Sequence, residues 1–291
     1  MTGGDGALPA GLRARVLDAS RQARPAGGSF PAVPEISPAE AFRRTADALY
    51  RTLRGLREDD WSRPAVRDLD VQGLVGHLIG VERDLQRALS GAPPAGRAGH
   101  VESTQGTAIR QAGRRPGQTL GEWRRAVART LIRLAAADDL NAVVAMPGVR
   151  MPLRALLVAR AFELWAHDGD VRVTSGLPAV VPDAPTLTLM TRLAASLLPR
   201  TAGRDGIAQP ALLHLVLTGP GGGTWDIETG KGSPPEGGGP ARARVSIVAD
   251  AAAFCRLVAN RVSPASVGAH ITGDHAAAAG ILAAAATLAL D

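Results

Sequence analysis

The chain has 291 residues, of which 45% are hydrophobic and 21% charged, so it carries enough apolar material for a folded core. This composition excludes a wholly disordered chain, and the length suits one or two domains. The apolar stretches are too short to span a membrane, and the first residues lack the pattern of a signal peptide, so we expect a cytoplasmic protein without a membrane partner. The single cysteine, Cys255, excludes an internal disulfide, and its apolar helical neighbours favour a buried, inert thiol.

The formal net charge is +6, from 33 basic and 27 acidic residues, and such a balance often indicates a nucleic-acid partner. All basic residues but one are arginine, and the arginines are spread along the chain, often beside acids. Aromatic residues make up only 3% of the chain, too few for platforms on which bases stack. We therefore expect no nucleic-acid partner.

The first part of the chain begins with an arm, residues 1–37, which holds a short amphipathic segment around Val16 and then a tract rich in Pro and Gly. Ser37 opens a capping box, with proline at the first helical position, and predicts a helix over 38–57. Asp70 can cap a second helix, which glycine and proline stop after Leu89.

A long polar loop is expected after the second helix, before another capping box at Thr119 opens a third. A fourth helix is predicted over about 152–168. A further apolar helical segment covers 187–198 and is expected to end at Pro199. The first part of the chain is thus predicted to be a small helical bundle.

From about residue 210 the periodicity changes to that of strands. Two short β-type runs, 213–217 and 224–228, flank a glycine-rich turn and predict a hairpin. Alternating Val245 and Ile247 predict a third strand, and Asp250 can cap a helix after it. Ile271 lies in another short predicted strand, and Asp274 can cap a last helix. We expect two domains, an all-α helical bundle over 38–203 and a small α+β domain over 204–291.

Two histidines lie inside predicted helices beside possible metal ligands. Glu163 and His167 are four residues apart, so they share one helical face with their Cβ atoms about 6 Å apart. His77 lies on the apolar stripe of the second helix and is expected to point into the bundle toward them. Two histidines and one glutamate are a common catalytic zinc set with one open coordination position. Two alternatives stay open, since a histidine among leucines is often a core residue and a Glu–His pair can be a simple helix contact.

The neighbours of this set have two interpretations each. Asp170 could accept the second ring N–H of His167, or it could cap the end of the helix. Arg160 could hold Glu163 in a salt bridge, or it could bind a carboxylate of the substrate or cofactor.

Two runs of this chain resemble the mycothiol-dependent maleylpyruvate isomerase family and the wider group of DinB-like bundles. The run 61–78, WSRPAVRDLDVQGLVGHL, resembles the family's tryptophan, proline, turn and helix that reaches His-Leu. The run 160–172, RAFELWAHDGDVR, resembles its Arg-x-x-Glu-x-x-x-His-x-x-Asp segment. Segments around Trp225, Arg261 and Gly273 resemble the sterol-carrier-like domain that often follows. The resemblance implies a DinB-like four-helix bundle followed by that α+β domain.

By this resemblance His77, Glu163 and His167 hold a divalent metal, with zinc the first expectation. It implies a cytoplasmic enzyme, an isomerase or thiol transferase, in which mycothiol is the thiol cosubstrate and a small, anionic electrophile is the substrate. It also places Arg261 over the metal pocket, where it could hold that substrate or the sugar part of the thiol, whereas a simple charge at a helix end is the alternative. We thus expect catalytic roles for Arg261 and Asp170, a cofactor-binding role for Arg160, and a monomer or homodimer.

A second hypothesis is a non-catalytic carrier, in which the sterol-carrier-like domain binds an apolar ligand and the bundle serves as a scaffold. A third is a metal site used for sensing or structure without turnover. The enzyme is favoured because an open site of two histidines and a glutamate has few structural uses.

Overall fold

The computed structural model describes Gly11, Arg15 and residues 33–93, 99–202, 211–229 and 243–288. The chain divides into two units, Met1–Pro34 and Glu35–Asp291, and the elements below belong to the second. The amphipathic segment expected around Val16 lies outside the described residues. Within the described part of the chain, no helix has both the length and the apolar character that crossing a bilayer requires.

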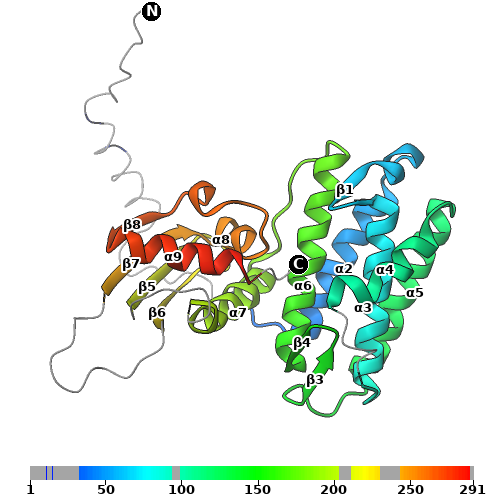
Figure 1. Cartoon of the computed structure of the whole chain (residues 1–291), viewed down its shortest axis with the longest axis horizontal. Coiled ribbons are helices and arrows are strands. Elements are labelled where there is room, and N and C mark those ends of the chain that lie inside the picture. The colour runs from blue at the N-terminus through cyan, green and yellow to red at the C-terminus, as the bar shows by residue number, and fades with distance from the viewer. Residues whose placement is uncertain are drawn as a thin grey trace, which may run out of the picture. The chain divides into compact units, whose positions relative to one another are not determined.

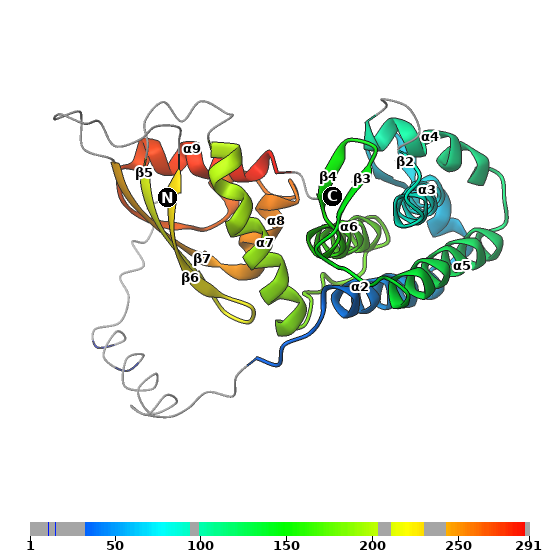
Figure 2. The same ribbon diagram turned by 90° about the horizontal axis from the view of Figure 1, so that it is seen from below.

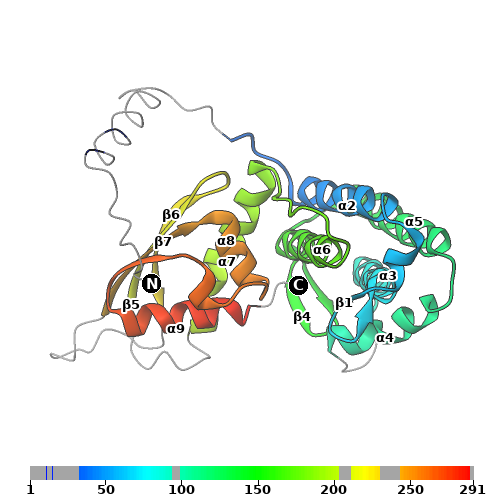
Figure 3. The same cartoon turned by 90° about the horizontal axis from the view of Figure 1, so that it is seen from above.

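Four helices pack around one apolar core (Figures 1 and 3). They are α2 (Pro38–Arg54), α3 (Val71–Leu89), α5 (Pro116–Ala135) and α6 (Leu153–Thr174). Leu49, Leu78, Trp123 and Leu157 come from these four helices in turn, and each is at most 1% exposed. The helical spacing of the apolar residues in the sequence thus matches the buried face of α2 and α5, whereas α3 and α6 are buried on all sides over residues 71–82 and 160–168.

Short elements connect the four helices. A 3₁₀ turn and an antiparallel hairpin precede α3, and a second antiparallel hairpin precedes α6. These elements are η1 (Glu58–Ser62), β1 (Pro64–Val66), β2 (Leu69–Asp70), β3 (Val143–Met146) and β4 (Val149–Pro152). The carboxylate of Asp70, at the end of the first hairpin, accepts a hydrogen bond from the backbone N–H of Gly73. It therefore caps α3 as expected.

The second part of the unit is a four-stranded sheet with helices on one face (Figure 2). Its order is β6-β5-β7-β8, in which β5 and β6 form the predicted hairpin and β5 runs parallel to β7. Alternate residues of β5 and β7 are buried against α7, α8 and α9. The bounds are α7 (Ala184–Ala202), β5 (Ala211–Thr218), β6 (Gly223–Thr229), β7 (Ala243–Asp250), α8 (Ala251–Val258), η2 (Pro264–Ser266), β8 (His270–Gly273) and α9 (His275–Ala286).

Several expected boundaries are wrong. The long polar loop contains a helix, α4 (His100–Gln111). α5 begins at Pro116 and not at Thr119, because proline at the first helical position starts it one turn earlier. α7 runs past Pro199 to its end at Ala202, since a proline this close to the end interrupts only the last turn. The domain bounds at 37/38 and 203/204 remain predictions, with α7 packed on the sheet and on α6.

The first turn of α2 carries an ion-pair cluster whose contribution to stability depends on pH. Hydrogen bonds from Arg43 and then Arg44 lower the pKa of Glu40 from 4.5 to about 2. A carboxylate with a depressed pKa stabilises the fold above its unfolded value, and this contribution is lost as the pH falls through its folded value. Replacing Glu40 by glutamine is expected to lower the free energy of unfolding at pH 7 by only about 1 kcal/mol, because the cluster is partly exposed. Urea titrations of both proteins should show this difference shrinking between pH 4.5 and pH 2, and a constant difference would contradict it.

Candidate metal centre

Helices α3 and α6 bring together the three residues that the sequence singled out. His77 comes from α3, while Glu163 and His167 lie one turn apart on α6. One ligand atom from each lies within 4.8 Å of the others, and all three residues are buried. The two imidazole rings meet edge to face with their centroids 5.8 Å apart. The expected inward orientation of His77 is therefore what the structure has.

The ring of His77 is held from behind by Thr104 of α4. The Nδ1 atom of His77 lies 2.6 Å from the Thr104 hydroxyl, which is itself 2.9 Å from the carbonyl oxygen of Val101. A hydroxyl has one hydrogen, so when Thr104 donates to Val101 it can only accept from His77. In that arrangement Nδ1 carries the proton, and the lone pair of Nε2 faces Glu163.

Two glycines of α3 allow α4 to lie close enough for this contact. A Cβ atom on Gly76 would lie 2.7 Å from the Cα of Ala108, and one on Gly80 would lie 2.8 Å from the side chain of Thr104. The two glycines flank His77 in the sequence. Close approach of the backbones therefore places Thr104 against the imidazole ring.

Replacing Gly76 by alanine is expected to push α4 away from α3, because the new methyl group meets backbone atoms that cannot move alone. We expect a loss of about 1–3 kcal/mol in the free energy of unfolding, measured in urea. Gly106→Ala is the matched control, since a Cβ atom there meets only the Arg110 side chain at 3.6 Å. That substitution should instead stabilise α4 by about 0.5–1 kcal/mol. Equal effects of the two changes would contradict the close-packing explanation.

Glu163 is oriented by a buried chain of ion pairs. One terminal nitrogen of Arg160 donates to Glu163 Oε2, and the other donates to Glu82 of α3 at 2.8 Å. Glu82 also accepts a hydrogen bond of 2.6 Å from the hydroxyl of Thr130 in α5. Arg160 is 2% exposed, and both of its terminal nitrogens bind carboxylates. The structure therefore favours the salt-bridge interpretation of Arg160 over contact with a substrate or cofactor.

His167 is held in the same way by Asp170. Its Nδ1 atom lies 2.9 Å from Asp170 Oδ2, and Arg261 donates to both oxygens of that carboxylate at 2.7 Å. Burial alone would raise the pKa of Asp170, but the hydrogen bonds from His167 and Arg261 outweigh burial and hold the pKa below its usual value. α6 continues to Thr174, so Asp170 lies inside the helix and is not its cap. An ionised Asp170 accepts the Nδ1 proton of His167 and leaves Nε2 for the centre of the cluster.

These residues fit a divalent ion. Two donors about 2.1 Å from a tetrahedral ion stand roughly 3.4 Å apart, and His77 Nε2 already lies 3.3 Å from Glu163 Oε1. Both imidazoles have their Nδ1 atoms turned toward outer partners, as metal-binding histidines usually do. The nitrogen and oxygen donors suit zinc, iron, manganese or nickel.

A cavity of about 510 Å³ adjoins the cluster through Asp170. Its walls come from β1, α6 and the region around the end of α8, where Arg256 and Arg261 line it. Cys255 lies nearby in the sequence but is buried, and burial raises the pKa of its thiol well above the ordinary value. The cysteine is therefore inert, as expected, and does not offer a thiolate at neutral pH.

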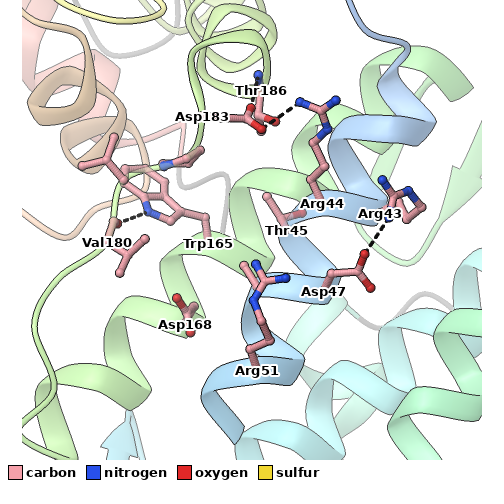
Figure 4. Close-up of a pocket in the computed structure, with 13 residues that line it drawn as sticks. Arg43, Arg44, Thr45, Asp47, Arg51, Trp165, Asp168, Val180, Asp183 and Thr186 are labelled. Carbon is pink, nitrogen blue, oxygen red and sulfur yellow. Dashed lines mark hydrogen bonds and ion pairs between the residues drawn. The ribbon is translucent and has the colours of Figure 1, made fainter. Parts of the chain in front are cut away.

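A second cavity of about 400 Å³ lies between α2, α6 and the start of α7 (Figure 4). Its lining arginines are largely neutralised, since Arg43 pairs with Asp47 and Arg44 pairs with Asp183. The indole of Trp165 lies between the two cavities and lines both. Of the two spaces, the one beside Asp170 carries the net positive charge.

Residues 42–172 match the sequence profile described as the "Mycothiol maleylpyruvate isomerase N-terminal domain". This segment belongs to that domain family. It contains His77, Glu163 and His167, together with the partners Thr104 and Asp170, so the whole cluster falls inside the matched segment. The family resemblance expected from the sequence is confirmed.

Two solved structures share the fold of this chain, and the likeness extends beyond the matched segment. One is a crystal structure of the mycothiol-dependent maleylpyruvate isomerase, with a TM-score of 0.55, 16% identity, and coverage of 81% of this chain and 91% of that chain. The other is a histidine-to-alanine mutant of that isomerase, with a TM-score of 0.54 and the same identity and coverage. Among curated proteins, none matches the chain significantly.

Three residues around the cluster are not indicated by the sequence. Thr104 lies in a segment for which the sequence predicts a polar loop, and no spacing rule links Glu82 to Arg160. The third, Arg256, lines the cavity beside Asp170. Glycines 76 and 80 were the available signal for Thr104, since two small residues one turn apart on a helix indicate a close neighbour.

Proposed function

We propose that this protein is a metal- and mycothiol-dependent enzyme, an isomerase or thiol transferase of the maleylpyruvate isomerase type. The observation that carries the proposal is the buried cluster of His77, Glu163 and His167, in which each ligand has its own orienting partner. Burying ionisable side chains costs free energy, and a buried cluster in which each of them is held by a hydrogen-bonding partner is typical of a metal site. Its place within the family domain agrees with this function.

The ligand set supports thiol activation as the chemistry. A divalent ion bound here by three protein ligands would lower the pKa of a thiol in its open position. The chain's own residues orient the site: Thr104 and Asp170 hold the two imidazoles, and Arg160 holds Glu163. Since Cys255 is buried, the thiol must come from a small molecule, for which we propose mycothiol.

The electrophile would enter the cavity beside Asp170. There, Arg256 and Arg261 supply positive charge, while alanine and valine side chains supply an apolar wall. A small, anionic electrophile suits such a space. Addition of sulfur to an activated cis alkene, rotation about the resulting single bond and expulsion of the thiol would give the trans product.

The carrier hypothesis has less support. The core between the sheet and α7, α8 and α9 is filled by apolar side chains. The cavity described on the strands is lined instead by His214, Asp226, Glu228 and Arg244 among others. Such a polar lining does not suit an apolar ligand.

The test is turnover of an activated cis dicarboxylic electrophile, maleylpyruvate first, by the zinc-loaded full chain. We expect activity that requires both mycothiol and metal. Turnover of the same rate without added thiol, or none with any small thiol and any of the four candidate metals, would contradict the proposal.

A further inference from the structure

Arg256 of α8 stands over the tryptophan that separates the two cavities. Its guanidinium carbon lies 5.9 Å from the centre of the Trp165 ring, within the range of a cation–π contact. The indole is itself fixed, because its N–H donates to the carbonyl oxygen of Val180 at 2.9 Å. Trp165 thus holds the guanidinium at the wall of the cavity beside Asp170.

Arg261 lines the same cavity, but it already binds partners within the fold. It donates twice to Asp170 and once to the carbonyl oxygen of Ala259. Moving it to a substrate would release the carboxylate that orients His167. Among the described residues, by contrast, no carboxylate forms an ion pair with Arg256.

The rest of the wall defines what Arg256 can bind. Asp170 is the only acid among the residues that line this described cavity, and Arg261 neutralises it. Most of the other residues that line the cavity are small or apolar, including Ala166, Gly169 and Val173. A planar guanidinium binds a carboxylate through two parallel hydrogen bonds. The space therefore suits a short hydrocarbon that carries a carboxylate at its far end.

We propose that Arg256, supported by Trp165, is the specificity-determining residue that binds a carboxylate of the electrophile. This inference rests on the proposed function only in taking the cavity as the electrophile's site. Arg261 then has a positioning role, through Asp170 and His167, and Arg256 has the anion-binding role that the family resemblance implied for Arg261.

The probe is maleate, a short cis dicarboxylate, titrated into the full-length zinc-loaded protein by calorimetry. We expect Arg256→Gln to weaken binding about 10- to 100-fold, because a charge-assisted bidentate contact is lost. Arg256→Lys should restore part of the affinity, since it returns the charge without the planar fork. Dimethyl maleate, which has no free carboxylate, should bind the parent more weakly and should be insensitive to Arg256→Gln. Arg192→Gln is the matched control, because it removes an exposed arginine from α7 away from both cavities.

Three outcomes would overturn the inference: no binding of maleate to the parent, equal binding to the parent and Arg256→Gln, or an equal loss in Arg192→Gln. Failure of the proposed function looks different. If maleate binds through Arg256 while no thiol supports turnover, the subsite stands and the enzymatic proposal falls. If thiol-dependent turnover occurs while Arg256→Gln binds maleate normally, the enzymatic proposal stands and the proposed subsite falls.

Discussion

Replacing His167 by alanine is expected to reduce bound metal from about one equivalent to almost none and to lower thiol-dependent turnover at least about 1,000-fold. His167 is fully buried, and its Nδ1 atom is held by Asp170, so no other side chain can take its place without rebuilding the helix. Metal content is measured by mass spectrometry after dialysis, and helical content by circular dichroism. The helical signal should be largely retained, because the variant removes a ring and no backbone contact.

His214→Ala is the control for this experiment. That histidine also pairs with a carboxylate, Asp226, at 2.7 Å, but the pair lies exposed on the sheet. Its removal should leave metal content and turnover unchanged. A normal metal content in His167→Ala, or an equal loss in both variants, would show that the ion is bound elsewhere.

Replacing Asp170 by asparagine is expected to weaken metal binding about 10- to 100-fold, the usual cost of losing the partner of a metal-binding histidine. The amide cannot hold the Nδ1 proton of His167 as a carboxylate does, and it leaves Arg261 without its ion pair. The affinity is measured by competition with a chromogenic chelator. Turnover should fall as well, and excess metal should restore part of it, whereas it should not restore His167→Ala.

Asp168→Asn provides the matched comparison. Asp168 is also a buried acid on α6 with an arginine partner, Arg172, at 2.8 Å, but it lines the cavity on the other side of Trp165. We expect a loss of stability without a change in metal affinity. If the two substitutions weaken metal binding equally, the effect of Asp170 would come from damage to α6 and not from the orientation of His167.

The cluster could be predicted from the sequence because its geometry is local or follows from amphipathicity. Glu163 and His167 are one turn apart, which alone puts them on one face of α6. His77 lies among leucines and valines, so the burial of the apolar stripe turns the ring inward. Two helices that pack on one core then bring the three side chains together.

The helix that supports His77 could not be predicted in this way. The buried residues of α4 include Thr104, Thr107, Ala108 and Gln111, so its inner face is small and polar and shows no apolar period. The contact with α3 depends on two glycines, which count as helix breakers in a sequence and serve here to let the helices approach.

The roles of the arginines also required the structure. Arg160, Arg256 and Arg261 are chemically alike, and the sequence cannot tell which of them carries an ion pair inside the fold. The structure separates them by their partners: two carboxylates hold Arg160, Asp170 holds Arg261, and an aromatic ring lies under Arg256. Pairings between residues about 80 or 90 positions apart depend on tertiary packing, which no local pattern encodes.

One divalent ion is expected to bind between α3 and α6, and a crystal of the zinc-loaded full chain tests this most directly. Data collected on both sides of the zinc absorption edge locate the ion without reference to its ligands. We expect one anomalous peak about 2.0–2.2 Å from His77 Nε2, His167 Nε2 and a carboxylate oxygen of Glu163. A peak at any other place, or no peak at this cluster in protein that carries zinc, would contradict the account.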